Sequence, residues 1–211
     1  MPLTLLCIRH GNTFDPGDTI LRVGKRTDLA LSSSGRAQAE KLGHYFAEQN
    51  LRPDLVFTST LKRTEETARI ALAAANFNAP CEARPELDEI DYGIDDGKPE
   101  SEVIARLGPQ TLKDWEEKTI MPAEWSPRPE KLQENAKNML LGFSMTSQIP
   151  FISEEIQTIW LVTSNGIARF FTDGCIWDCP APEQLKLSTA AFGHLEYDGK
   201  DWHIKGWNMR P

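Results

Sequence analysis

Short apolar runs alternate along the first half of the chain with stretches of helical spacing. Residues 3–8 form an apolar run without polar alternation, which is typical of a strand buried on both faces. Residues 34–49 place apolar side chains on one side of a predicted helix, for which Ser32, Ser33 and Ser34 are candidate N-caps. Residues 54–58 predict a second buried strand, which leads into a helix over 61–75 rich in Ala, Glu and Arg.

The second half of the chain continues this alternation. Residues 81–87 predict a third short strand that ends in an acidic loop. Prolines interrupt the mainly helical stretch 98–150, which we interpret as an inserted helical cap over one end of the sheet. Residues 158–166 predict a fourth buried strand leading into a helix that starts near Ile167. Two alternating runs around Asp198-Gly199 predict a hairpin.

This order of elements predicts the fold class. Strands that alternate with helices indicate a three-layer α/β/α sandwich with a largely parallel central sheet. The 211 residues contain no internal repeat, linker or low-complexity tract. We therefore expect a single domain over 1–211, with the cap insertion at about 98–150.

Composition and charge exclude several classes of partner. The net charge of −8 leaves no surplus of Lys and Arg for binding nucleic acid or an anionic membrane. The four cysteines lack a second pair of Cys or His at zinc spacing, so we expect free thiols in a reducing compartment and no metal. No segment is apolar enough to span a bilayer, and the N-terminus lacks a signal-peptide pattern. The expected location is the cytoplasm.

Candidate chemistry lies where the predicted strands end, because ligands of open α/β sheets bind beyond the carboxyl ends of the strands. Arg9 and Arg63 could hold an oxyanion through bidentate, charge-assisted hydrogen bonds. His10 could act as a nucleophile or a base, and Glu89 could donate or accept a proton. The turn at Ser164-Asn165-Gly166 presents backbone N–H groups at a helix start, which suits an anion.

The same segments resemble the histidine phosphatase superfamily, also called the phosphoglycerate mutase-like family. LCIRHGNT resembles its Arg-His-Gly signature, and LDEIDYGIDDGK resembles its acidic loop. GKRTDLALSSSGRAQAEKLG and STLKRTEETARIA resemble two of its helix starts. The resemblance implies a phosphoglycerate mutase-like fold and phosphoryl transfer without metal or cofactor. It places the nucleophile at His10, the phosphate-binding arginines at Arg9 and Arg63, and the proton-donating carboxyl at Glu89.

Two positions depart from the family pattern. Asn165 stands where the family usually carries a second histidine, and an amide donates a hydrogen bond without bringing charge. We expect this change to weaken the enzyme roughly 5- to 30-fold without silencing it. Pro16 stands where some members carry an Asn that contacts phosphate, and Asn12 could take part of that role. The loop 11–24 is therefore expected to shape a different substrate mouth.

Other candidates are interpreted as structural. Trp115 and Trp125 could line a substrate pocket, but the favoured interpretation is that they pack the cap against the body of the protein. The remaining cations of the cap and the other histidines are interpreted as surface or edge residues, namely Lys113, Lys118, Arg128, His44, His194 and His203.

Three functions remain open from the sequence. A phosphatase acting on a small phosphorylated metabolite, such as a sugar phosphate, is favoured. A degenerate domain that binds phosphorylated ligands or a protein is the alternative that Asn165 suggests. A phosphoglycerate mutase-type transferase is disfavoured by Asn165 and by the short, proline-rich cap. The substrate and the oligomeric state stay undetermined, and a homodimer is one assembly that the sequence allows.

Overall fold

The strands form a single mixed sheet. The computed structural model describes residues 3–145 and 156–211, and within them the sheet has the order β3-β2-β4-β1-β6-β7-β5. The strands are β1 (Leu3–Arg9), β2 (Leu55–Thr58), β3 (Cys81–Ala83), β4 (Thr158–Thr163), β5 (Ile176–Trp177), β6 (Phe192–Tyr197) and β7 (Trp202–Met209). Only β6 runs antiparallel to its neighbours within this part of the chain, and the other pairs are parallel. The prediction of a largely parallel sheet is confirmed.

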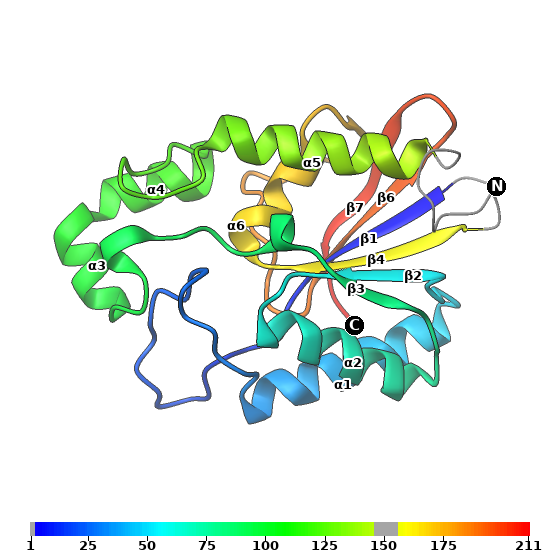
Figure 1. Ribbon diagram of the computed structural model, residues 1–211, viewed down its shortest axis with the longest axis horizontal. Coiled ribbons are helices and arrows are strands. Elements are labelled where there is room, and N and C mark those ends of the chain that lie inside the picture. The colour runs from blue at the N-terminus through cyan, green and yellow to red at the C-terminus, as the bar shows by residue number, and fades with distance from the viewer. Residues whose placement is uncertain (1–2, 146–155) are drawn as a thin grey trace.

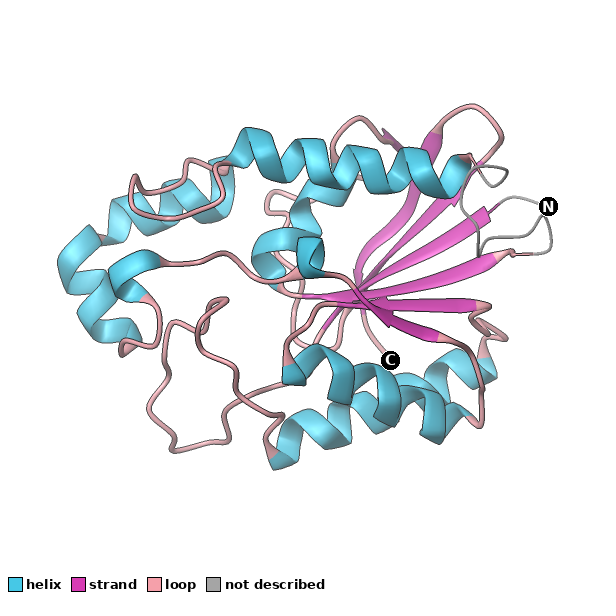
Figure 2. Ribbon diagram, viewed as in Figure 1, coloured by secondary structure: helices cyan, strands magenta, loops and turns pink. Residues whose placement is uncertain are grey.

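Helices cover both faces of this sheet (Figures 1 and 2). One face carries α1 (Ser33–Glu48) and α2 (Lys62–Ala75), and the other carries α5 (Pro129–Ser144) and α6 (Asn165–Ala168). Two further helices, α3 (Glu100–Leu107) and α4 (Pro109–Lys118), lie beyond one end of the strands. Short 3₁₀ turns occupy Pro85–Leu87, Gly93–Asp95 and Arg169–Thr172. The predicted α/β sandwich is confirmed.

The unbroken apolar run of β1 is explained by burial on both faces. Leu6 and Ile8 point into the core under α1 and α2, whereas Leu5 and Cys7 point into the core on the side of α5. All four side chains are nearly or completely inaccessible to solvent. A strand in this position has no solvent face, so its sequence shows no polar alternation.

The start of α1 follows the predicted capping chemistry. The Ser32 hydroxyl accepts a hydrogen bond from the Gly35 amide at 3.2 Å, so Ser32 is the N-cap residue. The Asp15 carboxylate accepts from the amides of Ser33 and Ser34 at 3.1 and 2.9 Å. These bonds fasten the loop after β1 to the start of α1.

The helices of the stretch 98–150, which was predicted to form one cap, lie in two different places in the structure. α3 and α4 lie at the strand ends, as a cap does, but α5 packs on the face of the sheet. Leu132, Ala136 and Leu140 are buried in the sheet core, and the Phe143 ring stacks on Phe57 at 5.4 Å between centroids. The apolar side of α5 therefore makes it a layer of the sandwich. Residues 146–150 lie outside the described residues.

The two cap tryptophans pack as expected. Trp115 and Trp125 are fully buried, and their rings meet edge to face at 5.9 Å between centroids. The Trp125 indole N–H donates to the Asp95 carboxylate at 2.8 Å, which satisfies its polar atom. The packing interpretation is confirmed for both residues, and Trp115 also lines the cleft described below.

The C-terminal part differs from prediction in one detail. The helix expected near Ile167 begins at Asn165 and becomes a 3₁₀ turn at Arg169. The predicted hairpin is formed by β6 and β7, with Gly199 in the turn at a φ of 102°.

The four cysteines are free thiols. Among the described residues, no helix has the length and apolar character needed to cross a bilayer.

Candidate active site

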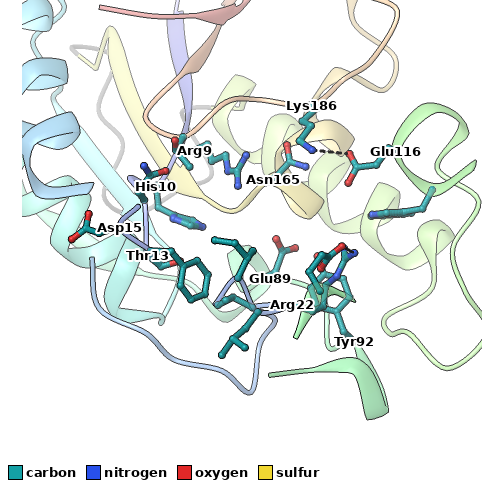
Figure 3. A pocket seen from close by; sticks show the side chains of 18 of the residues that line it. Arg9, His10, Thr13, Asp15, Arg22, Glu89, Tyr92, Glu116, Asn165 and Lys186 are labelled. Carbon is teal, nitrogen blue, oxygen red and sulfur yellow. Dashed lines mark hydrogen bonds and ion pairs between the residues drawn. The ribbon is translucent and has the colours of Figure 1, made fainter. Parts of the chain in front are cut away.

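A cleft of about 510 Å³ opens beyond the carboxyl ends of β1 and β4, where the sequence analysis expects the ligand (Figure 3). Its walls include Arg9 and His10 from the end of β1, and Asn165 from the start of α6. Glu89 enters from the acidic loop after β3. Parallel strands end at the same edge of a sheet, so these side chains meet although they are far apart in sequence.

His10 is held as a neutral imidazole. Its ring is buried, and its Nδ1 lies 2.7 Å from the Gly11 carbonyl oxygen. A carbonyl only accepts, so Nδ1 carries the hydrogen and Nε2 keeps its lone pair. Burial, together with the positive charges of Arg63 and Arg9, holds the pKa of His10 well below its usual range. A neutral imidazole with a free Nε2 is the form that can attack phosphorus.

Arg63 does not line the cleft. It is fully buried in the first turn of α2, and its guanidinium donates to the Thr27 carbonyl at 3.1 Å. It also donates to the Gly24 carbonyl at 3.3 Å and to the Ser164 hydroxyl at 3.4 Å. The segment that resembles the family from Gly24 onward therefore serves to fix this guanidinium.

The guanidiniums of Arg9 and Arg63 are desolvated, and each has an N–H group without an acceptor. Arg9 Nη1 donates to the Leu187 carbonyl at 2.6 Å. The Nε atoms of Arg9 and Arg63 are both buried and have no hydrogen-bond partner among the described residues. Burial lowers the pKa of both guanidiniums, and the negative charge of Glu89 opposes that shift. Buried guanidiniums without a full set of acceptors are suited to an anion.

Glu89 is fixed by backbone amides. Its Oε1 accepts from the Ile90 N–H at 2.9 Å, and its Oε2 accepts from the Gly166 N–H at 3.2 Å. A Cβ on residue 166 would lie 2.2 Å from Glu89 Oε1, so a side chain here would displace this carboxyl. The Gly166 amide, which the sequence analysis offers to an anion, donates to Glu89 instead.

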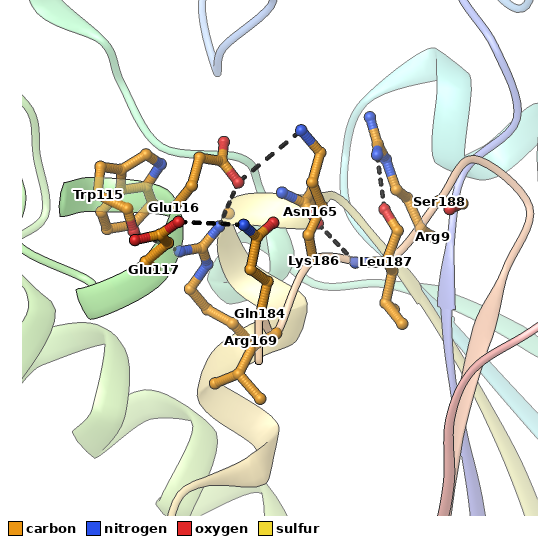
Figure 4. A network of polar contacts seen from close by, with 12 residues as sticks. Arg9, Trp115, Glu116, Glu117, Asn165, Arg169, Gln184, Lys186, Leu187 and Ser188 are labelled. Carbon is orange, nitrogen blue, oxygen red and sulfur yellow. Dashed lines mark hydrogen bonds and ion pairs between the residues drawn. The ribbon is translucent and has the colours of Figure 1, made fainter. Parts of the chain in front are cut away.

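Asn165 and Arg9 hold the same residue from two sides (Figure 4). Asn165 Oδ1 accepts from the Leu187 N–H at 2.9 Å, while the Leu187 carbonyl accepts from Arg9. This bond fixes the orientation of the amide and leaves Nδ2 as the end that can donate into the cleft. Asn12 lines the cleft, but its amide nitrogen donates to the Ser34 hydroxyl at 3.3 Å.

The cleft includes residues that the sequence analysis does not select. Arg22 forms an ion pair with Glu100, and its guanidinium lies 5.3 Å from the centroid of the Tyr92 ring. Glu116 and Lys186 face each other across the outer part of the cleft. Arg22 could have been selected from the sequence because it lies in the loop 11–24, which is expected to shape the substrate mouth. Nothing in the local sequence marks Lys186 as a cleft residue. His194, on β6, pairs with Glu196 and does not line the cleft.

The arrangement can bind and transfer a phosphoryl group. The guanidinium of Arg9 on the cleft wall and that of buried Arg63 supply positive charge, and the His10 imidazole supplies a nucleophile. The buried Glu89 carboxyl lies across the cleft from Arg9 and His10 (Figure 3). In the described part of the chain, no three His, Cys, Asp or Glu side chains gather in a way that could hold a metal ion.

Comparison with known proteins identifies the family. The sequence profile of the histidine phosphatase superfamily (branch 1) matches residues 5–210. The chain belongs to the histidine phosphatase superfamily. A 2,3-bisphosphoglycerate-dependent phosphoglycerate mutase of Clavibacter michiganensis is 34% identical over 122 residues, which cover 57% of this chain and 48% of that protein. The chain spans about half the length of the curated relatives it matches.

Solved structures of the superfamily share the fold. The phosphoglycerate mutase of Bacillus anthracis superposes with a TM-score of 0.79 at 18% identity, covering 98% of this chain and 93% of that one. A mycobacterial glucosyl-3-phosphoglycerate phosphatase superposes with a TM-score of 0.74 at 19% identity, covering 99% and 100%. The histidine phosphatase superfamily thus includes phosphatases and mutases on one fold, and the fold does not choose between them.

Proposed function

We propose that this chain hydrolyses a small phosphomonoester through a phosphohistidine formed on His10. The observation that carries the proposal is the neutral, buried His10 imidazole, whose cleft also holds Arg9 and Glu89 and whose pKa is lowered by burial and by the charges of Arg63 and Arg9. Membership of the histidine phosphatase superfamily supports the same class of reaction.

The first step transfers the phosphoryl group to the enzyme. His10 Nε2 forms a bond to phosphorus while the bond from phosphorus to the ester oxygen breaks. Arg9 and Arg63 stabilise the charge that spreads over the equatorial oxygens in the transition state. The protonated carboxyl of Glu89 gives its proton to the leaving oxygen, so the product departs as a neutral alcohol.

The second step restores the enzyme. The Glu89 carboxylate takes a proton from a water molecule, and the water oxygen attacks the phosphorus of the phosphohistidine. The bond between nitrogen and phosphorus breaks, which releases inorganic phosphate and the neutral His10 imidazole. Asn165 Nδ2 donates a hydrogen bond to the phosphoryl group in both steps, without charge.

The outer part of the cleft favours hydrolysis of a singly phosphorylated substrate. Glu100 and Glu116 line it, paired with Arg22 and Lys186. Because each of these cations is paired with a carboxylate, the four residues offer no net positive charge to a second phosphate or a carboxylate on the substrate. We propose a substrate with one phosphate and an uncharged remainder, such as a sugar phosphate, rather than the bisphosphate that a mutase requires.

Hydrolysis of 4-nitrophenyl phosphate by the parent and by His10→Ala tests the proposal. Removing a nucleophile should lower kcat by roughly 10³-fold or more. His44→Ala is the matched control, because His44 is an exposed residue of α1 and does not line the cleft. The parent should also form an acid-labile phosphoenzyme that His10→Ala does not form.

Two results would contradict this function. Equal background rates for the parent and His10→Ala would favour the domain that only binds phosphorylated ligands. Interconversion of 2- and 3-phosphoglycerate faster than their hydrolysis would favour the mutase.

A further inference from the structure

The phosphoryl-binding end of the cleft lacks a charged donor at Asn165. The neutral His10 imidazole and the Asn165 amide leave Arg9 and Arg63 as the cations nearest to the nucleophile. A phosphomonoester dianion brings two negative charges, and Glu89 adds another once it has given up its proton. A further cation at this end would stabilise the transferring group.

Lys186 is placed to supply that cation. It lines the cleft, and Figures 3 and 4 both show its side chain beside Asn165. The next residue, Leu187, is held on one side by Asn165 Oδ1 at 2.9 Å and on the other by Arg9 Nη1 at 2.6 Å. The backbone of Lys186 is therefore fixed next to two groups that we assign to the phosphoryl site.

The ammonium of Lys186 is held loosely. Its Nζ lies 3.9 Å from Glu116 Oε2, and its side chain is 51% exposed. The same carboxylate oxygen lies 3.4 Å from Nη2 of Arg169, whose side chain is 1% exposed. Arg169 thus compensates Glu116 without Lys186. Because a half-exposed pair at this distance contributes little, Lys186 can leave Glu116 at small cost.

We propose that Lys186 is a catalytic residue of the proposed phosphatase: on substrate binding its ammonium moves from Glu116 to a phosphoryl oxygen and supplies the charge that Asn165 does not. The flexible four-carbon stem of lysine permits this movement while the backbone stays in place. The ammonium remains protonated and donates a hydrogen bond, so it takes no part in the covalent steps. This inference rests on the proposed function and adds a residue to it.

A double-mutant cycle with Asn165→His tests the inference. Lys186→Met should lower kcat/KM for 4-nitrophenyl phosphate about 10-fold in the parent, the loss expected for one charged hydrogen bond. Asn165→His should raise the parent rate several-fold, because an imidazolium restores a charged donor, although it cannot accept the hydrogen bond from the Leu187 N–H that Asn165 accepts. In the Asn165→His background, Lys186→Met should lower kcat/KM less than about threefold, because the imidazolium then supplies the charge that Lys186 supplies in the parent.

Two more variants separate charge from structure. Lys186→Arg should recover most of the activity lost in Lys186→Met, since it keeps the cation. Lys113→Met is the matched control: Lys113 Nζ lies 4.0 Å from Glu117 Oε1, a pair of similar length, but Lys113 does not line the cleft. Its kcat/KM should stay at the parent value.

The affinity for inorganic phosphate, measured by calorimetry, gives a readout that does not require turnover. Lys186→Met should raise the Kd about 10-fold. Unchanged kcat/KM and Kd in Lys186→Met, or an equal loss in both backgrounds, would overturn the inference and leave the His10 mechanism intact. A raised Kd in a protein without His10-dependent turnover would instead keep Lys186 as a phosphate contact and refute the phosphatase.

Discussion

Glu89 shows how single hydrogen bonds prepare a residue for a role. The carboxyl is buried, and each of its oxygens accepts a backbone N–H, from Ile90 and from Gly166. These bonds fix its orientation toward the cleft, where the proposed mechanism uses it twice. It first protonates the leaving oxygen and then activates water. The two uses can be separated by the choice of leaving group.

Glu89→Gln should slow the two steps unequally. With 4-nitrophenyl phosphate, whose leaving group needs no proton, we expect a rapid burst of about one 4-nitrophenolate per chain, followed by turnover roughly 10²-fold slower or more. With glycerol phosphate, whose leaving group needs the proton, no burst should occur. Stopped-flow absorbance and a phosphate-release assay measure these phases. Equal losses without a burst for both substrates would show that Glu89 is not the proton donor.

At the scale of elements, a single buried guanidinium joins α4 to the segment that follows α6. Arg169 lies in the 3₁₀ turn after α6, and its guanidinium stacks on the Trp115 ring at 4.3 Å. It also donates to the Trp115 carbonyl at 2.8 Å and pairs with Glu116 at 3.4 Å. Through these contacts the helix that carries Glu116 is positioned over the cleft.

Arg169→Met should destabilise the protein while leaving the nucleophile in place. The cation–π contact and the charged hydrogen bonds are desolvated, so we expect a loss of about 2–3 kcal/mol in the free energy of unfolding. Urea denaturation at a constant m value measures it. Lys118→Met is the control on the same helix, because the pair of Lys118 with Asp114 is exposed to solvent and should contribute little to stability. Equal effects of both variants would refute this assignment.

At the scale of the whole molecule, the fold stabilises His10 in its neutral form. Its pKa lies well below the usual range because of burial and the two arginines. The unfolded chain, in which a histidine has a pKa of about 6.5, therefore binds a proton that the folded protein does not bind at mildly acidic pH. Above the unfolded pKa neither state binds this proton, whereas below it the unfolded chain binds the proton and the stability of the folded state falls with the pH.

The stability of the parent should accordingly fall faster on acidification than that of His10→Asn. Thermal or urea unfolding at about pH 7.5 and about pH 5.5 should show an extra loss in the parent, approaching roughly 1.4 kcal/mol per pH unit below about 6.5. The other ionisable groups are common to both proteins and cancel in the comparison. Parallel pH profiles would mean that His10 is protonated in the folded protein.

Local pattern was sufficient for the principal elements and for much of the site. The apolar runs, the serines before α1 and the turn at Gly199 predicted β1, the start of α1 and the hairpin, because burial period, capping and turn chemistry act over a few residues. The family motifs predicted Arg9, His10 and Glu89, which the fold brings to one cleft, and Arg63, which is buried outside the cleft lining and acts on His10 through its charge. The position of α5 could not be predicted in this way, since its apolar side fits a cap as well as a sheet face.

The sequence by itself determined the fold class, the family and the residues at the strand ends, because these follow from periodicity and from motifs carried within short segments. Only the tertiary structure decided that Gly166 donates to Glu89, that Asn165 and Arg9 both hold Leu187, and that Lys186 lines the cleft beside Asn165. Each of these contacts joins residues distant along the chain. No local pattern encodes such pairs, because their energy depends on which surfaces the packed sheet brings together.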